Sequence, residues 1–177
     1  MPNIYKTREI ALCEIIGGEN LIDEIQHAVQ SWVWCFYYWV SKICHATDHY
    51  TTDEKIKLYR KVINLYENLY ENHDHLFGLK RTLMCYEEMA GFLLEDGRVE
   101  ECIAHLEKAI KYAELCENYD LKCKPTSLLI NTMDITNGWR ESYKEEKSYL
   151  HYKLTTQPRY DSIRETPEFK KILEKLA

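Results

Sequence analysis

The sequence predicts an all-α fold built from antiparallel helical hairpins. Apolar residues recur at steps of three and four along most of the chain, a spacing that places them on one face of a helix. The 177 residues include only six glycines and four prolines, and these lie at the edges of the periodic segments. No stretch of alternating β-branched residues indicates a strand. The chain can therefore be divided, in order, into helices and the turns that join them.

Two helices are expected in the N-terminal part. The first covers residues 5–16 and ends at the glycine pair 17–18, because glycine readily adopts the left-handed conformation found at helix C-termini. The second extends from about 20 to 46, and Asn20 can cap its start. Its front half carries apolar side chains on one side only. Its back half is apolar almost all round, which is typical of a helix enclosed by its neighbours.

The back half of this second helix contains an aromatic run. Residues 32–40 are nine consecutive apolar or aromatic residues, and three of them are tryptophan. A membrane-spanning helix needs about 20 apolar residues, and polar residues close this run at 30–31 and 41–42. The first residues also lack the basic-then-apolar pattern of a signal peptide. We therefore expect a soluble, cytoplasmic protein in which the run is mostly core and packs against the third and fourth helices.

The third helix begins at a capping box. Thr51 and Glu54 have the spacing at which each side chain can bind a backbone N–H of the other residue. Apolar residues then follow at helical spacing as far as residue 70. The polar stretch 72–75 indicates the turn that ends this segment.

The fourth and fifth helices are expected to form an antiparallel pair. The fourth covers residues 76–95, and the turn residues Asp96 and Gly97 end it. The fifth runs from 99 to about 116 and carries an uninterrupted apolar stripe. A polar connector at 117–125 follows it.

Three shorter helices complete the chain. Two are expected at 126–135 and 142–154. The last is well marked, because Thr166 can cap it and Pro167 takes the first helical position, where no N–H is needed. Its apolar stripe consists of Phe169, Ile172, Leu173 and Leu176.

The turn at Gly97 also supports a helical repeat. A tetratricopeptide repeat (TPR) pairs two helices whose small residues allow close approach. Placing Gly97 on the turn glycine gives one complete repeat. A second copy, in which residues 54–62 align with 101–109, is weaker because Lys55 occupies a position that takes a small residue in the repeat. The predicted architecture is a short, right-handed, TPR-like solenoid at 20–177, preceded by a short segment at 1–19. The signature places are filled by Tyr86, Met89, Ala90, Leu93, Val99, Cys102, Leu106 and Ala109.

Four segments carry a family resemblance, and they are Glu54–Tyr59, the repeat around Gly97, Thr126–Asn131, and Pro158–Arg164 leading into Phe169. In order and residue type they resemble the C-terminal region of helix-turn-helix (XRE-type) transcriptional regulators of Gram-positive bacteria, in which TPR-like helices follow a DNA-binding domain. The resemblance implies a regulatory module that senses a ligand, often a short peptide, or mediates dimerisation. A DNA-binding domain needs about 55–65 residues, so DNA contact is expected only through a separate N-terminal domain. The net charge of −6 also argues against a nucleic-acid surface here.

The candidate partner-binding residues are aromatic residues of the run and side-chain amides. Amides offer both a donor and an acceptor to a peptide backbone, although asparagines in such a pattern are more often surface or capping residues. The first functional hypothesis is a sensor and interaction domain that binds a peptide or protein on its concave face. The alternative is a homodimerisation module without a ligand, in which the aromatic run packs against its twin. The candidate residues are Trp34, Tyr37, Tyr38, Asn64, Asn68 and Asn131.

Signatures of an enzyme, a cofactor site or a metal site are lacking. His45 and His49 could share a helix face and hold zinc, but a polar helix end explains them equally simply. Glu87 and Glu88 are adjacent, so on a helix their side chains point about 100° apart and do not form a ready acid/base pair. We expect both of them on a solvated face. Cys35 could be a redox-sensing thiol or an inert buried one. The seven scattered cysteines, without a CxxC pair, favour reduced thiols. We therefore expect a protein that binds other molecules without transforming them.

Overall fold

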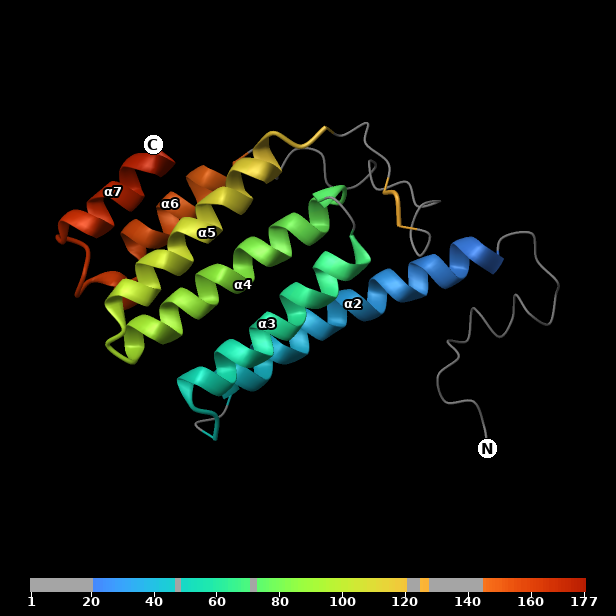
Figure 1. Ribbon diagram of the computed structural model, residues 1–177, viewed down its shortest axis with the longest axis horizontal. Coiled ribbons are helices and arrows are strands. Elements are labelled where there is room, and N and C mark those ends of the chain that lie inside the picture. The colour runs from blue at the N-terminus through green and yellow to red at the C-terminus, as the bar shows by residue number, and fades with distance from the viewer. Residues whose placement is uncertain (1–20, 47–48, 71–72, 121–124, 128–144) are drawn as a thin grey trace.

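The chain is all-α throughout the residues that the computed structural model describes, which are 21–46, 49–70, 73–120, 125–127 and 145–177 (Figure 1). The predicted helix at 5–16, and nearly all of the one at 126–135, lie outside these residues. The other predicted helices are present. The one predicted at 142–154 begins four residues later than expected, at Glu146. The helices are α2 (Leu21–Ala46), α3 (Thr52–Leu69), α4 (Leu76–Glu95), α5 (Val99–Glu117), α6 (Glu146–Thr156) and α7 (Pro167–Leu176), with a 3₁₀ turn η3 at Pro158–Tyr160.

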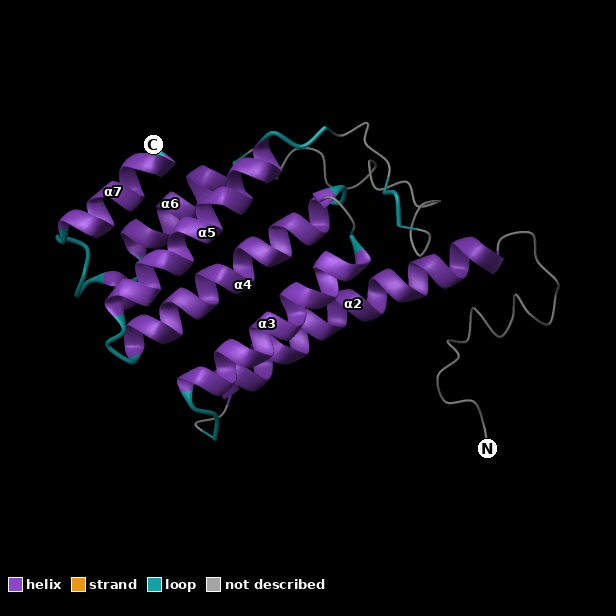
Figure 2. Cartoon of the chain, in the orientation of Figure 1, coloured by secondary structure: helices purple, strands orange, loops and turns teal. Residues whose placement is uncertain are grey.

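Consecutive helices lie side by side, as Figures 1 and 2 show. α2 packs on α3, α3 on α4, and α4 on α5, while α6 and α7 pack on α5 and on each other. The turn η3 reaches back to α4. Among the described helices, α2 therefore forms one edge of the array, because α3 is its main neighbour, while α6 and α7 together form the other edge on α5.

One continuous core runs through this array. Every described helix contributes fully buried side chains. From α2 these are limited to Cys44, and Val33, Tyr37 and Val40 of the same helix are nearly buried. A smaller cluster joins the start of α4 to the end of α5. The apolar stripes predicted for α3, α5 and α7 supply much of this core, as expected from their helical spacing. The largest fully buried side chains are Tyr59, Tyr66, Met89, Leu93, Leu106, Leu150, Leu154, Tyr160, Phe169 and Ile172.

The predicted helix caps at Thr51 and Thr166 are confirmed, and the one predicted at Asn20 lies outside the described residues. The Thr51 hydroxyl accepts a hydrogen bond from the Glu54 N–H at 3.3 Å, and a Glu54 carboxylate oxygen accepts one from the Thr51 N–H at 2.8 Å. The Thr51 N–H and the Thr51 hydroxyl both donate to the Glu54 carboxylate, and these two bonds hold the pKa of Glu54 below its usual range. At α7, the Thr166 hydroxyl accepts from the Phe169 N–H at 3.3 Å. The local sequence therefore sets where α3 and α7 begin.

The α4–α5 turn is a Schellman motif. Gly97 has φ +75°, in the left-handed region. Its N–H donates to the Leu94 carbonyl at 2.9 Å, and the Arg98 N–H donates to the Leu93 carbonyl at 2.8 Å. These two bonds satisfy carbonyls that the end of a helix otherwise leaves without partners.

Replacing Gly97 by alanine is expected to lower the free energy of unfolding by about 1 kcal/mol, because a Cβ disfavours the left-handed conformation. No other atom lies within 4 Å of the position that the Cβ would take, so the loss comes from the backbone alone. Urea unfolding measures it. Gly97→Asn is the control, since asparagine tolerates this conformation better and should cost less. Equal stability of the alanine variant and the parent protein would contradict this account of the turn.

The expectation that the aromatic run is mostly buried is wrong for one side of α2. Trp32, Tyr38 and Trp39 are 58%, 53% and 47% exposed, although Tyr37 between them is buried. The reason lies in the arrangement of helices. Because α2 is an edge helix, α3 and α4 cover only one of its faces, whereas a helix that is apolar all round needs neighbours on several sides.

Candidate interaction surface on α2

The inner face of α2 is fixed to the rest of the fold. The Tyr66 hydroxyl of α3 donates to the Val33 carbonyl at 3.3 Å. The ring of Tyr37 lies 6.4 Å from that of Tyr59, measured between centroids, and the guanidinium of Arg81 lies 4.8 Å from the Tyr37 centroid. These contacts from α3 and α4 set the rotation of α2 about its axis, and so determine which side chains face outward.

The outer face of α2 carries a second apolar row, which we call the α2 stripe. Its members follow one another at alternating steps of three and four, the spacing of the core positions in a coiled coil. The stripe is strongly exposed at several points, including Ile22 (64%), Trp32 (58%) and Ile43 (41%). Val29 and Phe36 are half-buried against the core. The stripe consists of Ile22, Ile25, Val29, Trp32, Phe36, Trp39 and Ile43.

The central rings of the stripe hold one another in place. Trp32 stacks on Phe36 at a centroid distance of 6.1 Å, and it meets Trp39 edge-on at 6.5 Å. Beside them, the ammonium of Lys42 lies 5.3 Å from the Tyr38 centroid. Aromatic pairs in these geometries gain energy beyond the area they bury. These contacts restrict the positions of the rings, and large aromatic side chains of this kind often anchor protein interfaces.

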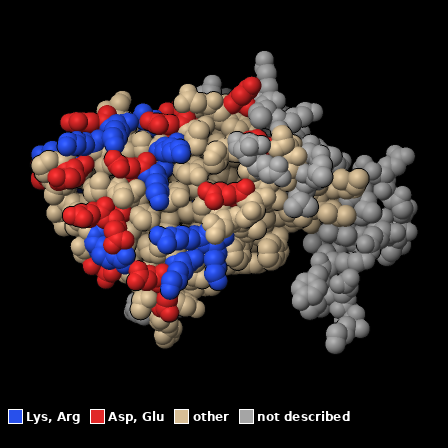
Figure 3. All heavy atoms as spheres, viewed as in Figure 1, with Lys and Arg blue, Asp and Glu red and all other residues tan. Residues whose placement is uncertain are grey.

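The α2 stripe is large enough to be functional. Its exposed apolar surface is on the order of 500 Å², since each large aromatic side chain can bury about 150–250 Å². Patches of this size on a single chain often mark a binding surface. The charged side chains, by contrast, are interspersed in sign over the face shown in Figure 3. Apolar contact is therefore the chemistry that this part of the molecule offers most clearly.

A polar cluster joins α4 to the C-terminal part of the chain. Glu87 is 1% exposed, and its carboxylate accepts hydrogen bonds from Lys153 Nζ at 2.5 Å and from the Tyr160 hydroxyl at 3.3 Å. The next residue, Glu88, binds Nε2 of His45 at 3.0 Å. The expected solvated face is therefore wrong for Glu87, because α6 and η3 cover it. Both carboxylate oxygens of Glu87 are paired with residues of the C-terminal part, which joins α6 and η3 to α4.

Arg159 extends this cluster along α4. Its guanidinium binds Glu95 at 2.8 Å and lies 3.5 Å from a Glu88 oxygen. A Cβ placed on Gly91 would come within 2.2 Å of the Arg159 guanidinium carbon. Glycine at this position lets the guanidinium lie directly on the α4 backbone, which fixes η3 against the helix.

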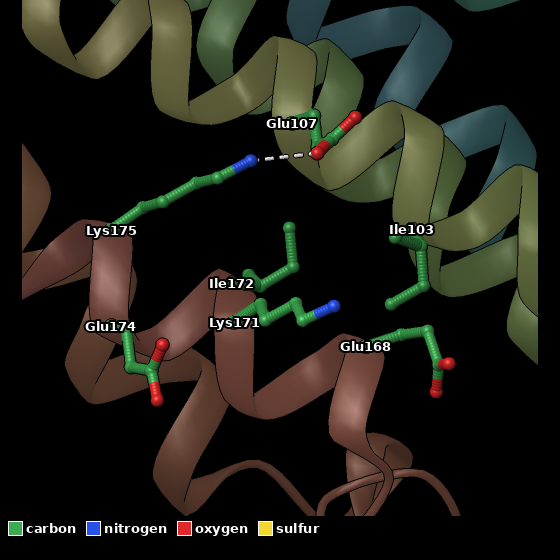
Figure 4. A pocket seen from close by; sticks show the side chains of 7 residues that line it. All are labelled: Ile103, Glu107, Glu168, Lys171, Ile172, Glu174 and Lys175. Carbon is green, nitrogen blue, oxygen red and sulfur yellow. Dashed lines mark hydrogen bonds and ion pairs between the residues drawn. The ribbon is translucent and has the colours of Figure 1, made fainter.

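Two surface hollows are lined by charges of both signs. One has a volume of about 380 Å³ and lies between α5 and α7, where Lys175 Nζ binds Glu107 at 2.7 Å (Figure 4). The other, of about 170 Å³, lies beside Arg98, whose guanidinium binds Asp53 at 2.6 Å and Glu101 at 2.7 Å. Arg98 holds the pKa of both carboxyl groups below their usual range. In these ion pairs the lining residues balance one another's charge, which leaves less charge to bind an ionic ligand.

Neither hollow is lined by a cysteine of the described residues. Burial raises the pKa of Cys44 to about 11 and those of Cys102 and Cys116 to about 12, which keeps these thiols protonated and poorly nucleophilic. Within the described residues, no group of three or more His, Cys, Asp or Glu side chains could hold a metal ion. His45 binds Glu88 at the end of α2, in line with a polar helix end.

The chain matches no family model, no curated protein and no solved structure. The exposed surfaces of the helices are therefore the basis for assigning a function. Within the described part of the chain, no helix is long and apolar enough to cross a membrane.

The structure places the predicted site residues in different surroundings. Tyr37 is buried in the core, so its ring is not presented to a partner, whereas Tyr38 is exposed beside the α2 stripe. Asn64 and Asn68 are exposed on α3, and the Asn68 amide donates to the Asn64 carbonyl at 2.6 Å. The Trp34 side chain and Asn131 lie outside what the structure describes. Reasoning from sequence missed the stripe as an outer face, although its regular spacing from Ile22 to Ile43 was visible.

Proposed function

We propose that this chain is a protein-interaction domain that docks a helical partner surface through the α2 stripe. The observation that carries the proposal is the exposure of Trp32 and Trp39 within a row that has coiled-coil spacing. Large aromatic side chains of this kind contribute most of the binding energy in many interfaces. The inner face of α2 already serves the core, so the outer face is free to serve a partner.

A TPR-like scaffold within a transcriptional regulator is the setting that we propose for this domain. From α2 to α5, each helix packs mainly on its neighbours in sequence, as in solenoid proteins, whereas α7 also packs on α5. Ala90 and Cys102, the small residues expected at the close approach of a repeat, are fully buried. In this setting a separate helix-turn-helix domain contacts the DNA. The helices described above bind the partner, and partner binding changes how the DNA-binding domain acts.

Peptide sensing is a second candidate, supported by the exposed Asn64 amide on α3 and the exposed Tyr38 on α2. An amide can bind an extended peptide backbone through both its donor and its acceptor. A peptide at 100 times its Kd would stabilise the fold by about 2.7 kcal/mol. A thermal-shift screen against short peptides tests this role, and an unchanged melting temperature across the screen would argue against it.

Docking through α2 can be tested by site-specific photo-crosslinking in the expressing cell. Replacing Tyr38 by benzoylphenylalanine is expected to give a discrete protein adduct, because this side chain is 53% exposed beside the stripe. Tyr152 on α6 is a matched control, since it is a tyrosine with 63% exposure far from α2 in sequence. The adduct should disappear when Trp32→Ser is added.

The same variant must leave the fold intact for the test to be informative. Trp32→Ser is expected to change the free energy of unfolding of the isolated domain by about 1 kcal/mol or less, since surface substitutions cost little. Far-UV circular dichroism and urea unfolding check this. Equal crosslinking from positions 38 and 152, or an adduct that survives Trp32→Ser, would contradict docking through α2.

A further inference from the structure

We infer that the helical partner of the α2 stripe is a second copy of this chain, paired antiparallel along α2. The inference rests on the proposed function and names the partner for the same surface. The first reason is that the stripe can cover itself. Its steps of three and four continue from Ile22 to Ile43, so a twofold axis can lay one stripe along another. In a register that pairs six of the seven residues, Trp32 faces Phe36, Trp39 faces Val29, and Ile43 faces Ile25 of the second copy, and Ile22 lies opposite Ala46 at the end of the helix.

The rows that flank the stripe favour the antiparallel arrangement. On one side lie Ala28, Cys35 and Lys42, of which Cys35 and Lys42 are exposed. On the other side lie Gln26, Val33 and Val40, all buried within the chain's own fold. A parallel pair of helices would place the exposed row of one copy against the buried row of the other, which α3 already occupies. An antiparallel pair places the two exposed rows together on one side of the seam, and on the other side each buried row stays covered by the α3 of its own chain.

Charge and area are both compatible with a pair of identical chains. The seven stripe residues are all uncharged, so two copies meet without like-charge repulsion. Covering both stripes would bury about 1,000 Å² in total, which is the lower bound for a specific protein interface. Trp32 and Phe36 lie at the centre of this contact, where residues that dominate binding energy are usually found.

This register determines where Cys35 lies relative to Cys35 of the second copy. Residues of the exposed row face one another across the twofold axis, so Cys35 lies opposite Cys35 of the second copy, and Ala28 lies opposite Lys42. In a parallel pair the two Cys35 side chains would lie on opposite flanks of the seam. Cys35 is an exposed free cysteine, so a crosslink between copies can report the register directly.

The experiment combines light scattering with disulfide trapping. At a protein concentration of about 100 μM, a dimer with a micromolar Kd is almost fully formed. We expect size-exclusion chromatography with light scattering to give twice the monomer mass, and Trp32→Ser to weaken the dimer by about 30-fold or more. Diamide should then join the two Cys35 thiols, taking up the two hydrogens that they release. Cys35→Ser should remove this crosslink without changing the scattering mass.

A heterologous pair of variants separates the two helix directions. In the Cys35→Ser background, one sample carries Ala28→Cys and a second, bearing an affinity tag, carries Lys42→Cys. Mixing them and adding diamide should give tagged-to-untagged crosslinked pairs. A monomer at about 100 μM, or a Trp32→Ser variant whose dimer Kd, measured by dilution, equals that of the parent protein, would overturn the inference. A dimer that fails to crosslink through Cys35, or through the mixed pair, would overturn the antiparallel register.

The two proposals fail in different ways. If the chain is monomeric but photo-crosslinking at position 38 still gives an adduct that needs Trp32, the α2 stripe binds a different protein. Docking through α2 then stands and pairing with a second copy falls. If neither adduct nor dimer forms, both proposals fall together.

Discussion

Replacing Glu87 by alanine is expected to lower the free energy of unfolding by about 3–5 kcal/mol, the usual cost of removing one partner from a buried ion pair. The carboxylate is 1% exposed, and it is the acceptor for both Lys153 Nζ and the Tyr160 hydroxyl. Without it, the ammonium group of a 16% exposed lysine side chain and a fully buried hydroxyl lose their partner together. Urea unfolding followed by circular dichroism measures the loss.

Glu95 provides the matched control on the same helix. Its carboxylate also binds a basic side chain of the C-terminal part, Arg159 at 2.8 Å, but it is 55% exposed. Glu95→Ala should therefore cost about 1 kcal/mol or less, as for other exposed ion pairs. If Glu87→Ala and Glu95→Ala lower the free energy of unfolding equally, burial does not explain how much the Glu87 pair stabilises the fold. A double-mutant cycle with Lys153→Met isolates the pairwise energy.

The position of Glu87 shows where reasoning from sequence stops. Two adjacent glutamates on a helix face different directions, and solvent is the usual surrounding for both. The partners that bury Glu87 lie 66 and 73 residues further along the chain, so no local pattern announces them. A buried carboxylate of this kind follows from how α6 and η3 return to α4, which depends on tertiary packing.

The helix boundaries, by contrast, could be predicted because their causes are local. The capping box at Thr51, the glycine turn at Gly97 and the Thr166–Pro167 pair each act within a few residues. For the same reason the bounds of α4 matched those expected. The N-cap residue of α6, Glu145, makes no cap bond. A distant side chain takes its place, since the Glu117 carboxylate of α5 accepts from the Lys147 N–H at 3.1 Å, and the predicted beginning of this helix was less accurate.

The face of α2 is an intermediate case. Periodicity correctly predicted a long helix with apolar residues on more than one side, and it could not decide which side the fold would cover. That choice depends on the position of α2 at the edge of the array and on contacts such as Tyr66 with Val33. The α2 stripe is thus the part of the candidate site that only the structure could assign.

Lowering the pH from about 7 to about 4 is expected to remove about 3 kcal/mol of stability through His75 alone. Burial is the main cause that lowers the pKa of His75 to about 4, and Asp74 opposes it. The unfolded chain has a histidine pKa of about 6.5. Between these two values the unfolded state binds a proton that the folded state does not. Stability is therefore full above the unfolded value and is lost as the pH falls towards the folded one.

The environment of His75 explains why the folded protein resists protonating it. The imidazole stacks on Tyr70 at a centroid distance of 4.1 Å, and its Nδ1 accepts a hydrogen bond from the Gly78 N–H at 3.4 Å, which caps α4. Nε2 is buried and has no hydrogen-bond partner among the described residues. A proton on Nδ1 would remove the acceptor that caps the helix, and a charge on this ring would lie away from water.

His75→Asn provides the test, because asparagine keeps a capping oxygen and cannot titrate in this range. The variant is expected to be less stable at pH 7, since it loses the ring stacked on Tyr70, but its stability should fall less steeply from pH 7 to 4.5. Urea unfolding at several pH values gives both slopes. Asp53, Glu101 and Glu165 have lowered pKa values and titrate in both proteins, so the difference between the slopes isolates His75. Identical slopes would show that the imidazole is protonated as easily in the folded state as in the unfolded one.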